Sequence, residues 1–159
     1  MRVVPTIYEI RVALETTLFL ALTPSFQAEE IVIIQPGEEI APDLKKIQVI
    51  HSVNPGKVQV GELDLRGGAS IRPGVYTIML SCPNEVDAYI QTTKLTDVIE
   101  RAFSGKELSA GDGKKVFIDL VDIENPGKLP DNRLGQTISV NWWAWAGEFD
   151  DEIEDFEGE

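Results

Sequence analysis

The stretch VYTIMLSCPNEVDAYIQTTKLTDVIERAFSG, residues 75–105, contains a strand pattern followed directly by a helix pattern. Alternation in its first part predicts a strand that presents one apolar face, made of Tyr76, Ile78, Leu80 and Cys82. After the break at Pro83-Asn84, the apolar spacing becomes that of a helix from Val86 to Ser104, with a stripe made of Ala88, Leu95, Val98, Ile99, Ala102 and Phe103. Asn84 or Asp87 is placed to cap its start, and Gly105 stands where a left-handed C-cap is expected.

A further helix is predicted ahead of this stretch, beginning at a capping box. Thr6 and Glu9 have the spacing at which hydroxyl and carboxylate satisfy each other's main-chain N–H groups. Helical apolar spacing then continues to Leu22, and the helix is expected to end just before Pro24. A membrane-surface helix would need several basic residues, and this one offers only Arg11, so we expect it to pack on the core.

Short strands are predicted between the two helices. Residues 31–34 form an apolar run, and residues 47–53 alternate; the turn signal Asn54-Pro55-Gly56 then predicts a hairpin with a strand that begins at Val58. Residues 66–74, RGGASIRPG, lack the spacing of a phosphate-binding loop and are predicted to be a flexible connection.

Two more strands are predicted after the second helix. In residues 116–123 we expect Val116, Ile118 and Leu120 on one side. A long loop is expected over residues 124–135, followed by a last strand over residues 136–147. Alternation in this last strand places Trp142 on one face and Trp143 and Trp145 on the other.

The order of elements predicts the fold class. We expect an α+β fold with a mostly antiparallel sheet of four to six strands and two helices packed on one face, in the order α-β-β-β-α-β-β. Residues 1–147 are predicted to form this single domain. Residues 148–159 are predicted to be a flexible, acidic C-terminal arm.

Composition excludes several classes of protein. The 159 residues include 27 acidic and 14 basic side chains, a net charge of −13, with one Cys and one His. A disulfide scaffold and a cysteine zinc site are excluded, and a basic nucleic-acid binder is disfavoured because phosphates are neutralised by Lys and Arg. The beginning of the sequence resembles no signal peptide, and no apolar run is long enough to cross a bilayer, so we expect a soluble protein made inside the cell and no membrane partner.

The negative charge is concentrated in the arm. Residues 148–159, EFDDEIEDFEGE, hold eight acidic residues, which leaves the rest of the chain with a net charge of −5. Such a block is typical of a solubilising tail. Phe149, Ile153 and Phe156 interrupt it, however, and also allow a strand or arm that orders on a partner.

Candidates for catalysis are few. Cys82 and His51 are the residues able to act as nucleophile and base, but both fall on apolar faces of predicted strands, where structural roles are expected. One His without metal-ligand spacing predicts no metal site, and no motif indicates a cofactor. We therefore expect no enzyme activity.

Trp142, Trp143 and Trp145 are the unusual local feature of the sequence. One face of a strand cannot bury all three, so one set is expected in the core and the other on the opposite sheet face. There the aromatic rings are covered either by a loop or tail of the same chain or by a partner. Aromatic residues are favoured anchors of protein interfaces.

An order of motifs from Arg72 to Trp145 resembles the tail terminator (tail completion) proteins of long-tailed bacteriophages. The segment Arg72-Pro73-Gly74-Val75-Tyr76-Thr77-Ile78 is similar to a strand motif of that family. The similarity continues through the following helix and two strands, in Ala88, Thr96-Asp97, Phe103-Ser104-Gly105, Val116-Phe117-Ile118, Asp131-Asn132 and Ile138-Ser139-Val140. Residues 31–66 depart from the family pattern.

The resemblance implies a structural virion protein without catalytic activity. Such a subunit assembles into a hexameric ring that caps the tail tube, contacts the tail-tube protein and the head–neck connector, and lets DNA pass without specific binding. It is assembled in the host cytoplasm and located in the tail or neck of the virion. On this basis the expected subunit or partner interface consists of Trp143, Trp145, Phe149, Ile153, Phe156, Arg66 and Arg72.

Three alternatives remain open at this point. Another neck or head-completion protein of a tailed phage needs the same ring contacts. An acidic inhibitor that mimics DNA is a second class, although its carboxylates would be spread over the folded domain rather than gathered in a tail. A hydrolase that uses Cys82 and His51 is the third.

Overall fold

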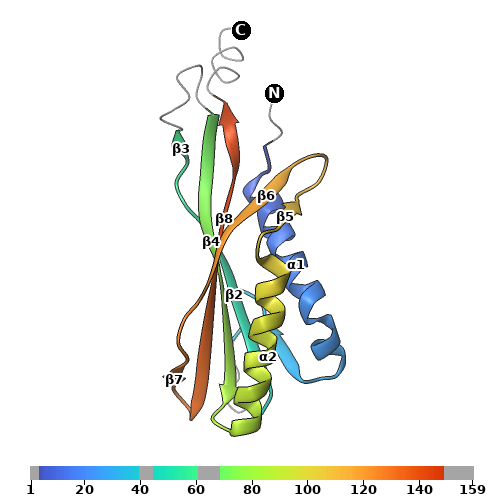
Figure 1. Cartoon of the computed structure of the whole chain (residues 1–159), viewed down its shortest axis with the longest axis vertical. Helices are drawn as coiled ribbons and strands as arrows, with labels where there is room; N and C mark the ends of the chain where they lie inside the picture. Colours follow the sequence, from blue (N-terminus) through green and yellow to red (C-terminus); the bar gives the residue numbers. More distant parts are fainter. Residues whose placement is uncertain (1–3, 40–44, 61–68, 149–159) are drawn as a thin grey trace.

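Two long strands, β4 (Ala69–Pro83) and β8 (Arg133–Glu148), form the centre of the sheet. They pair antiparallel along their whole length, from Ala69 opposite Glu148 to Pro83 opposite Arg133. The computed structural model describes residues 4–39, 45–60 and 69–148. Figure 1 shows that the Ala69 end of β4 and the Glu148 end of β8 reach beyond the helices.

The sheet among the described residues has eight strands, six of them in the order β1-β2-β4-β8-β6-β5. The short strands β3 and β7 pair with β4 and β8, respectively. Only β1 and β2 run parallel; the other pairs are antiparallel. The remaining strands are β1 (Ile31–Ile34), β2 (Ile47–Pro55), β3 (Gln59–Val60), β5 (Glu107–Ser109), β6 (Lys115–Ile123) and β7 (Gly127–Leu129).

Both described helices, α1 (Ile7–Gln27) and α2 (Val86–Phe103), cover the same face of the sheet (Figure 1). The core lies between them and that face, where β4 and β8 contribute alternate side chains. The expected α+β class, with two helices on one face of a mostly antiparallel sheet, is confirmed. The sheet has eight strands among the described residues instead of the four to six expected, because the short strands β5 and β7 add to those expected. The largest fully buried side chains of this core include Leu14, Leu18, Tyr76, Ile78, Phe103 and Trp142.

Helix α1 begins as predicted and ends later. The main-chain N–H of Thr6 donates to Glu9 Oε1 at 2.9 Å, and the N–H of Glu9 donates to Thr6 Oγ1 at 3.1 Å, which completes the capping box. The predicted end before Pro24 is wrong, because the helix continues to Gln27 with Pro24 in its last turns. Proline there lacks the N–H that would donate to the carbonyl of Leu20, an exposed residue.

The predicted hairpin between residues 47–53 and Val58 is also wrong. Strands β2 and β3 lie end to end along β4, since Pro55 pairs with Gly74 and Gln59 pairs with Ile71. Gly56 joins them by donating its N–H to the carbonyl of Pro73 at 2.7 Å. A Cβ at Gly56 would lie 2.7 Å from that carbonyl oxygen, so glycine allows the strand line to continue instead of reversing.

Two predicted connections are partly strand. The glycine-rich segment from residue 66 enters β4 at Ala69, and the loop expected over residues 124–135 contains β7 and the start of β8. Arg133, at that start, is 7% exposed. Its Nε donates to Ser81 Oγ at 2.7 Å, and its Nη2 donates to the carbonyls of Ser81 and Lys46 at 2.8 and 3.0 Å. These bonds join β8 to β4 and to the start of β2, and the sequence did not single them out.

Helix α2 follows the prediction closely. It runs from Val86 to Phe103, and Gly105 has the left-handed φ of 68° that was expected after its end. Glu85 is the N-cap residue and makes no side-chain cap bond, so neither Asn84 nor Asp87 has the predicted capping role. The helix start instead carries Asp87 in its first turn, where a negative charge is favourable.

Candidate interaction surface

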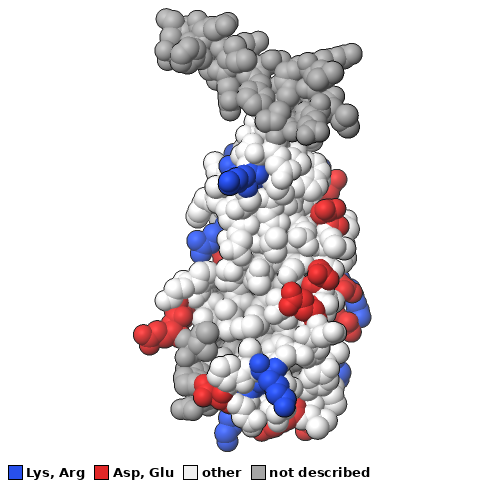
Figure 2. Space-filling view, turned by 90° about the vertical axis from the view of Figure 1, so that its left-hand side faces the viewer, with Lys and Arg blue, Asp and Glu red and all other residues white. Residues whose placement is uncertain are grey.

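One face of the sheet carries no helix, and we call it the open face. It consists of the alternate residues of four strands that point away from α1 and α2. Figure 2 looks at this side of the molecule and shows mostly uncharged surface, with a basic group in its upper part, an acidic group in its middle and further charged residues toward the margins and the lower end. Asp122, which pairs with Ser139, is an exposed acidic residue of this face. The open face includes Ile50, Ser52, Val75, Thr77, Met79, Phe117, Leu120, Ser139, Asn141, Trp143 and Trp145.

Three aromatic residues of the open face form a cluster, Phe117, Trp143 and Trp145. The rings of Phe117 and Trp143 stack, with centroids 4.3 Å apart and an interplanar angle of 16°. Trp145 meets Trp143 edge-on at 5.2 Å and 89°. All three side chains are half-buried, whereas Trp142 is 1% exposed on the helix-covered side. The predicted division of the tryptophans between two faces is confirmed.

Phe117 and Leu120 are the members of the open face that sequence reasoning missed. Phe117 is brought to Trp143 by the pairing of β6 with β8, and strand alternation alone does not give that register. Leu120 was expected beside Ile118, but the register shifts between these two residues and turns Leu120 to the open face, where it is 59% exposed. Strand alternation alone does not reveal this bulge, because alternation assumes an unbroken register.

The other predicted interface residues have different outcomes. Arg72 is half-buried, and its Nη1 donates to the carbonyl of Gly56 at 3.0 Å, so it holds the junction between β2 and β3 against β4. Arg66, Phe149, Ile153 and Phe156 lie outside the described residues. Trp143 and Trp145 are therefore the predicted interface residues that the structure brings together on one face.

Cys82 and His51 do not form a catalytic pair. Both are buried on the helix-covered face, but His51 lies opposite Ile78, four residues before Cys82 along β4. At roughly 3.3 Å per strand residue, this offset separates them by about 13 Å. A nucleophile and its base need direct hydrogen-bond contact.

His51 belongs instead to a buried polar group that links β2, β4 and α1. Its Nδ1 lies 2.9 Å from the Tyr76 hydroxyl and 3.5 Å from Glu15 Oε2, while its Nε2 has no partner among the described residues. Burial lowers the pKa of His51, and the nearby Arg11 lowers it further, against the opposing effect of Glu15. Burial also raises the pKa of Tyr76. Both groups are therefore neutral at physiological pH.

The neutral state of His51 predicts a loss of stability in mild acid. Because its pKa is lower in the folded chain than the ordinary 6.5, the unfolded chain takes up the proton first as pH falls. The stabilisation that neutral His51 contributes is complete above pH 6.5. It is lost as the pH falls toward the lower pKa of the folded chain, and over this range the free energy of unfolding changes by up to about 1.4 kcal/mol per pH unit. Urea unfolding between pH 7.5 and 5.5 measures this pH dependence of the free energy of unfolding. His51→Gln is expected to be less stable overall but to depend less on pH in this window; equal slopes for the two proteins would contradict the assignment.

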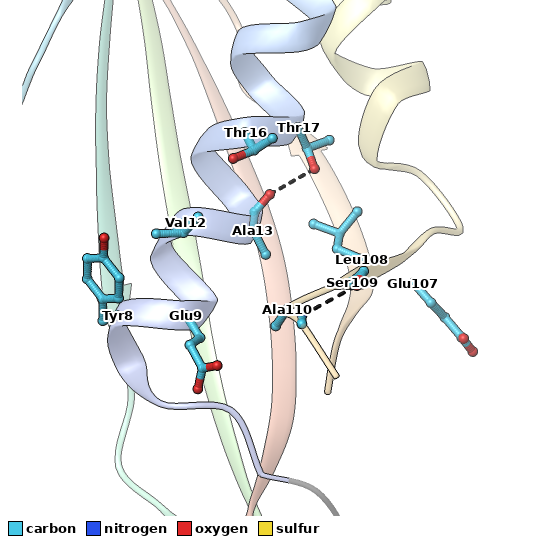
Figure 3. A pocket seen from close by; sticks show the side chains of 11 residues that line it. Tyr8, Glu9, Val12, Ala13, Thr16, Thr17, Glu107, Leu108, Ser109 and Ala110 are labelled. Carbon is cyan, nitrogen blue, oxygen red and sulfur yellow. Dashed lines mark hydrogen bonds between the residues drawn. The ribbon is translucent and has the colours of Figure 1, made fainter. Parts of the chain in front are cut away.

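A groove of about 490 Å³ lies between α1 and β5 (Figure 3). Its walls include Val12, Thr16 and Leu108, together with Glu9. Lys114 Nζ lies 2.8 Å from Glu9 Oε2, and this contact, with the N–H of Thr6, lowers the pKa of Glu9. The ion pair joins the start of α1 to the turn before β6.

Neither a metal-binding cluster nor a helix able to span a membrane is present among the described residues. No group of three or more His, Cys, Asp or Glu residues in this part of the chain is arranged to hold a metal ion. Neither α1 nor α2, the helices of the described part, has the length and apolarity that a membrane span requires.

Comparison with known proteins supports the fold. No protein-family model and no curated protein matches the chain. A solved structure that carries no functional description matches with a TM-score of 0.64 at 16% identity, over 89% of this chain and 96% of that one. A chain from the virion of a native gene transfer agent particle matches with a TM-score of 0.44 at 8% identity, over 84% and 96%. The first similarity establishes a shared fold alone, and the second score is too low to carry an argument.

Proposed function

We propose that this chain is a structural protein of a tailed-phage virion and acts as a tail terminator subunit, in a ring that caps the tail tube and joins it to the head–neck connector. The observation that carries the proposal is the aromatic cluster on the open face. Large aromatic side chains on an otherwise uncovered sheet face are typical of a protein interface. The order of elements also agrees with the motif order on which the resemblance to tail terminators rests.

The proposed activity is assembly and requires neither catalysis nor a cofactor. A closed ring needs contacts that repeat from one subunit to the next, and apolar surface supplies their free energy. The net charge of −13 suits a ring through which DNA travels, since a negative lumen repels phosphates. The partners proposed are further copies of this chain, the tail-tube protein and the connector, in the virion tail or neck.

The arm is proposed to be either a solubilising tail or a docking segment for one of these partners. It follows directly on the end of β8 and lies outside the described residues apart from Glu148. Assembly measured with and without residues 149–159 separates the two roles. Unchanged assembly with lower solubility supports the tail, and lost binding to one partner supports docking.

Native mass spectrometry and light scattering test the proposal, on the chain alone and mixed with tail-tube protein of a long-tailed phage. We expect a hexamer, or a monomer that assembles on the tube protein. Trp143→Ser should weaken this association about tenfold or more, as expected for an interface anchor. Val86→Ser is the matched control, since Val86 is 74% exposed on α2, away from the open face.

A chain that stays monomeric with and without tube protein would contradict the proposal. Rings that bind connector protein and ignore tube protein would identify a neck or head-completion protein instead. Equal effects of Trp143→Ser and Val86→Ser would show that the open face is not the contact surface.

A further inference from the structure

Strand β5 lies at one edge of the sheet, and no described strand pairs with its outer side. On its inner side, the N–H of Ala110 donates to the carbonyl of Lys114 at 2.9 Å. Residues of an antiparallel pair are alternately bonded to the partner strand and turned away from it. Leu108 is therefore bonded to β6, whereas the main-chain groups of Glu107 and Ser109 point outward. The N–H and carbonyl groups of these two residues are available to a further strand.

The groove between α1 and β5 runs along this outer edge. Its lining includes both Glu107 and Ser109, and Figure 3 shows Ala13 of α1 on one of its sides and Leu108 on the other. A segment that extends a sheet beside a helix gains main-chain hydrogen bonds and places every second side chain against the helix. The edge and the groove together therefore suit an extended segment with an apolar residue that faces α1.

The C-terminal arm begins near this edge and has the right direction. Strand β5 runs parallel to β8, since both are antiparallel to β6, so a chain that turns back after β8 runs antiparallel to β5. Phe117 lies opposite both Trp143 and Glu107, which places these residues at one level of the sheet. At roughly 3.3 Å per residue, Glu148 then extends about 10 Å beyond Ser109, the last residue of β5.

Residues 149–159 are long enough to reach this edge and to extend it. Three strand spacings of about 4.8 Å lead from β8, across β6 and β5, to the place of a further strand. With the offset of about 10 Å along the strands, the path is roughly 18 Å, which about six extended residues span. Eleven residues follow Glu148, so about five remain to pair with β5. Phe156 is the apolar residue of this last part.

The charges at the edge also suit an acidic segment better than the rest of the chain does. Residues 106–115 hold three lysines against Glu107 and Asp112, a net charge of +1 in a chain whose total is −13. The two glutamates of the groove, Glu9 and Glu107, are both in ion pairs with lysines. Lys106 is exposed at the start of β5, and no described acidic group forms an ion pair with it. An acidic segment antiparallel to β5 runs toward this lysine.

We propose that residues 149–159 turn back after β8 and bind along the β5 edge of their own chain, antiparallel to β5, with Phe156 in the groove against α1. This contact pairs the outward main-chain groups of Glu107 and Ser109. It also covers an edge that is otherwise open to pairing with another chain. The contact is a further role for the arm, within one subunit, and does not depend on the proposed function.

Amide hydrogen exchange, measured residue by residue on the full chain, tests the contact. Phe156→Asp places a charge in the apolar groove and should release the arm. We expect the amides of Glu107 and Ser109 to exchange at least about tenfold faster in this variant than in the wild type, because they lose their hydrogen-bond acceptors. Phe149→Asp makes the same change in the part of the arm that spans the gap, and should leave both amides protected. Amides of β1, at the opposite edge of the sheet, should exchange alike in all three proteins.

A second pair of variants tests the groove from the side of α1. Val12 lines the groove and is 41% exposed, whereas Leu20 is 70% exposed on the same helix and lies outside the groove. Val12→Asp should accelerate exchange at Glu107 and Ser109 as Phe156→Asp does, and Leu20→Asp should not. Circular dichroism and thermal unfolding establish that each variant is folded.

A mixing experiment distinguishes binding within one chain from binding between copies. Isotope-labelled Phe156→Asp is unfolded and refolded together with an excess of unlabelled wild type, and exchange is followed on the labelled chain alone. Fast exchange at Glu107 and Ser109 supports binding within one chain. Restored protection would show that the arm of a neighbouring copy occupies the edge, and would overturn the inference.

Two other outcomes would also overturn the inference. Amides of Glu107 and Ser109 that exchange without protection in the wild type would leave the arm as a solubilising tail. Equal effects of Phe156→Asp and Phe149→Asp would show that the groove does not hold Phe156. None of these results depends on assembly with tube protein, so a chain that fails to assemble contradicts the proposed function and leaves this inference standing.

Discussion

Gly74→Ala is expected to destabilise the fold by about 3 kcal/mol or more, because overpacking a tight core costs roughly 1–3 kcal/mol and this contact is unusually close. Gly74 lies opposite Trp142 in the β4–β8 pair. A Cβ at Gly74 would lie 2.2 Å from Trp142 Cζ2 and 2.5 Å from Cε2. Carbon atoms pack best at roughly 3.5–4.0 Å, so the indole would have to move. Trp142 is 1% exposed and has no free space on the solvent side.

Urea unfolding of Gly74→Ala and of a matched control measures this effect. Gly127→Ala adds the same methyl group where no atom lies within 4 Å, and should change the free energy of unfolding by about 0.5 kcal/mol or less. Trp142→Leu removes the ring atoms that clash. Combined with Gly74→Ala, it should cost less than the sum of the two single changes. Equal stability of Gly74→Ala and Gly127→Ala would contradict the packing described for Trp142.

Arg133→Met is expected to cost about 3 kcal/mol, because hydrogen bonds from a charged group contribute roughly 1.5–3 kcal/mol each and are not fully additive. Methionine fills a similar space but cannot donate to Ser81 Oγ, to the carbonyl of Ser81 or to that of Lys46. The acceptors that Arg133 now satisfies would lose this donor in a buried place. The strands most affected are β2, β4 and β8, at the end of the sheet opposite the aromatic cluster.

Lys128→Met provides the comparison for this second change. It removes a positive charge from an exposed residue of the neighbouring strand β7, and we expect it to be nearly neutral. Arg133→Lys should fall between wild type and Arg133→Met, since it keeps the charge but not the fork of donors. If denaturation midpoints of Arg133→Met and Lys128→Met coincide, the role assigned to Arg133 is wrong.

The elements that follow from local pattern were predictable from the sequence. The strand and helix of residues 75–105 and the capping box at Thr6 depend on neighbouring residues only, and the structure agrees with them. The path of β2 and β3 was not predictable, because it depends on the contact between Gly56 and the carbonyl of Pro73, a residue distant in the sequence. Turn residues signal a change of direction but do not distinguish a reversal from a kink.

The candidate surface was predictable to a similar degree. Alternation separated Trp142 from Trp143 and Trp145, and so indicated an aromatic face. The sequence did not indicate that Phe117 stacks on Trp143, since strand pairing between β6 and β8 decides that contact. Nor did helical spacing show how exposed Leu20 is, because exposure depends on where the sheet and α2 end.

The place of β8 in the sheet determines when the molecule becomes complete during synthesis. Strand β8 follows every other strand in the chain, yet it lies between β4 and β6 in the sheet. Before β8 leaves the ribosome, the nascent protein therefore consists of two separate halves, β1-β2-β4 and β6-β5, without the strand that joins them. Trp143 and Trp145 lie on this same strand, so a growing chain cannot present the open face early. Until β8 is made, the edges of β4 and β6 that it will pair with are unpaired, and such edges make an incomplete chain prone to associate with its neighbours.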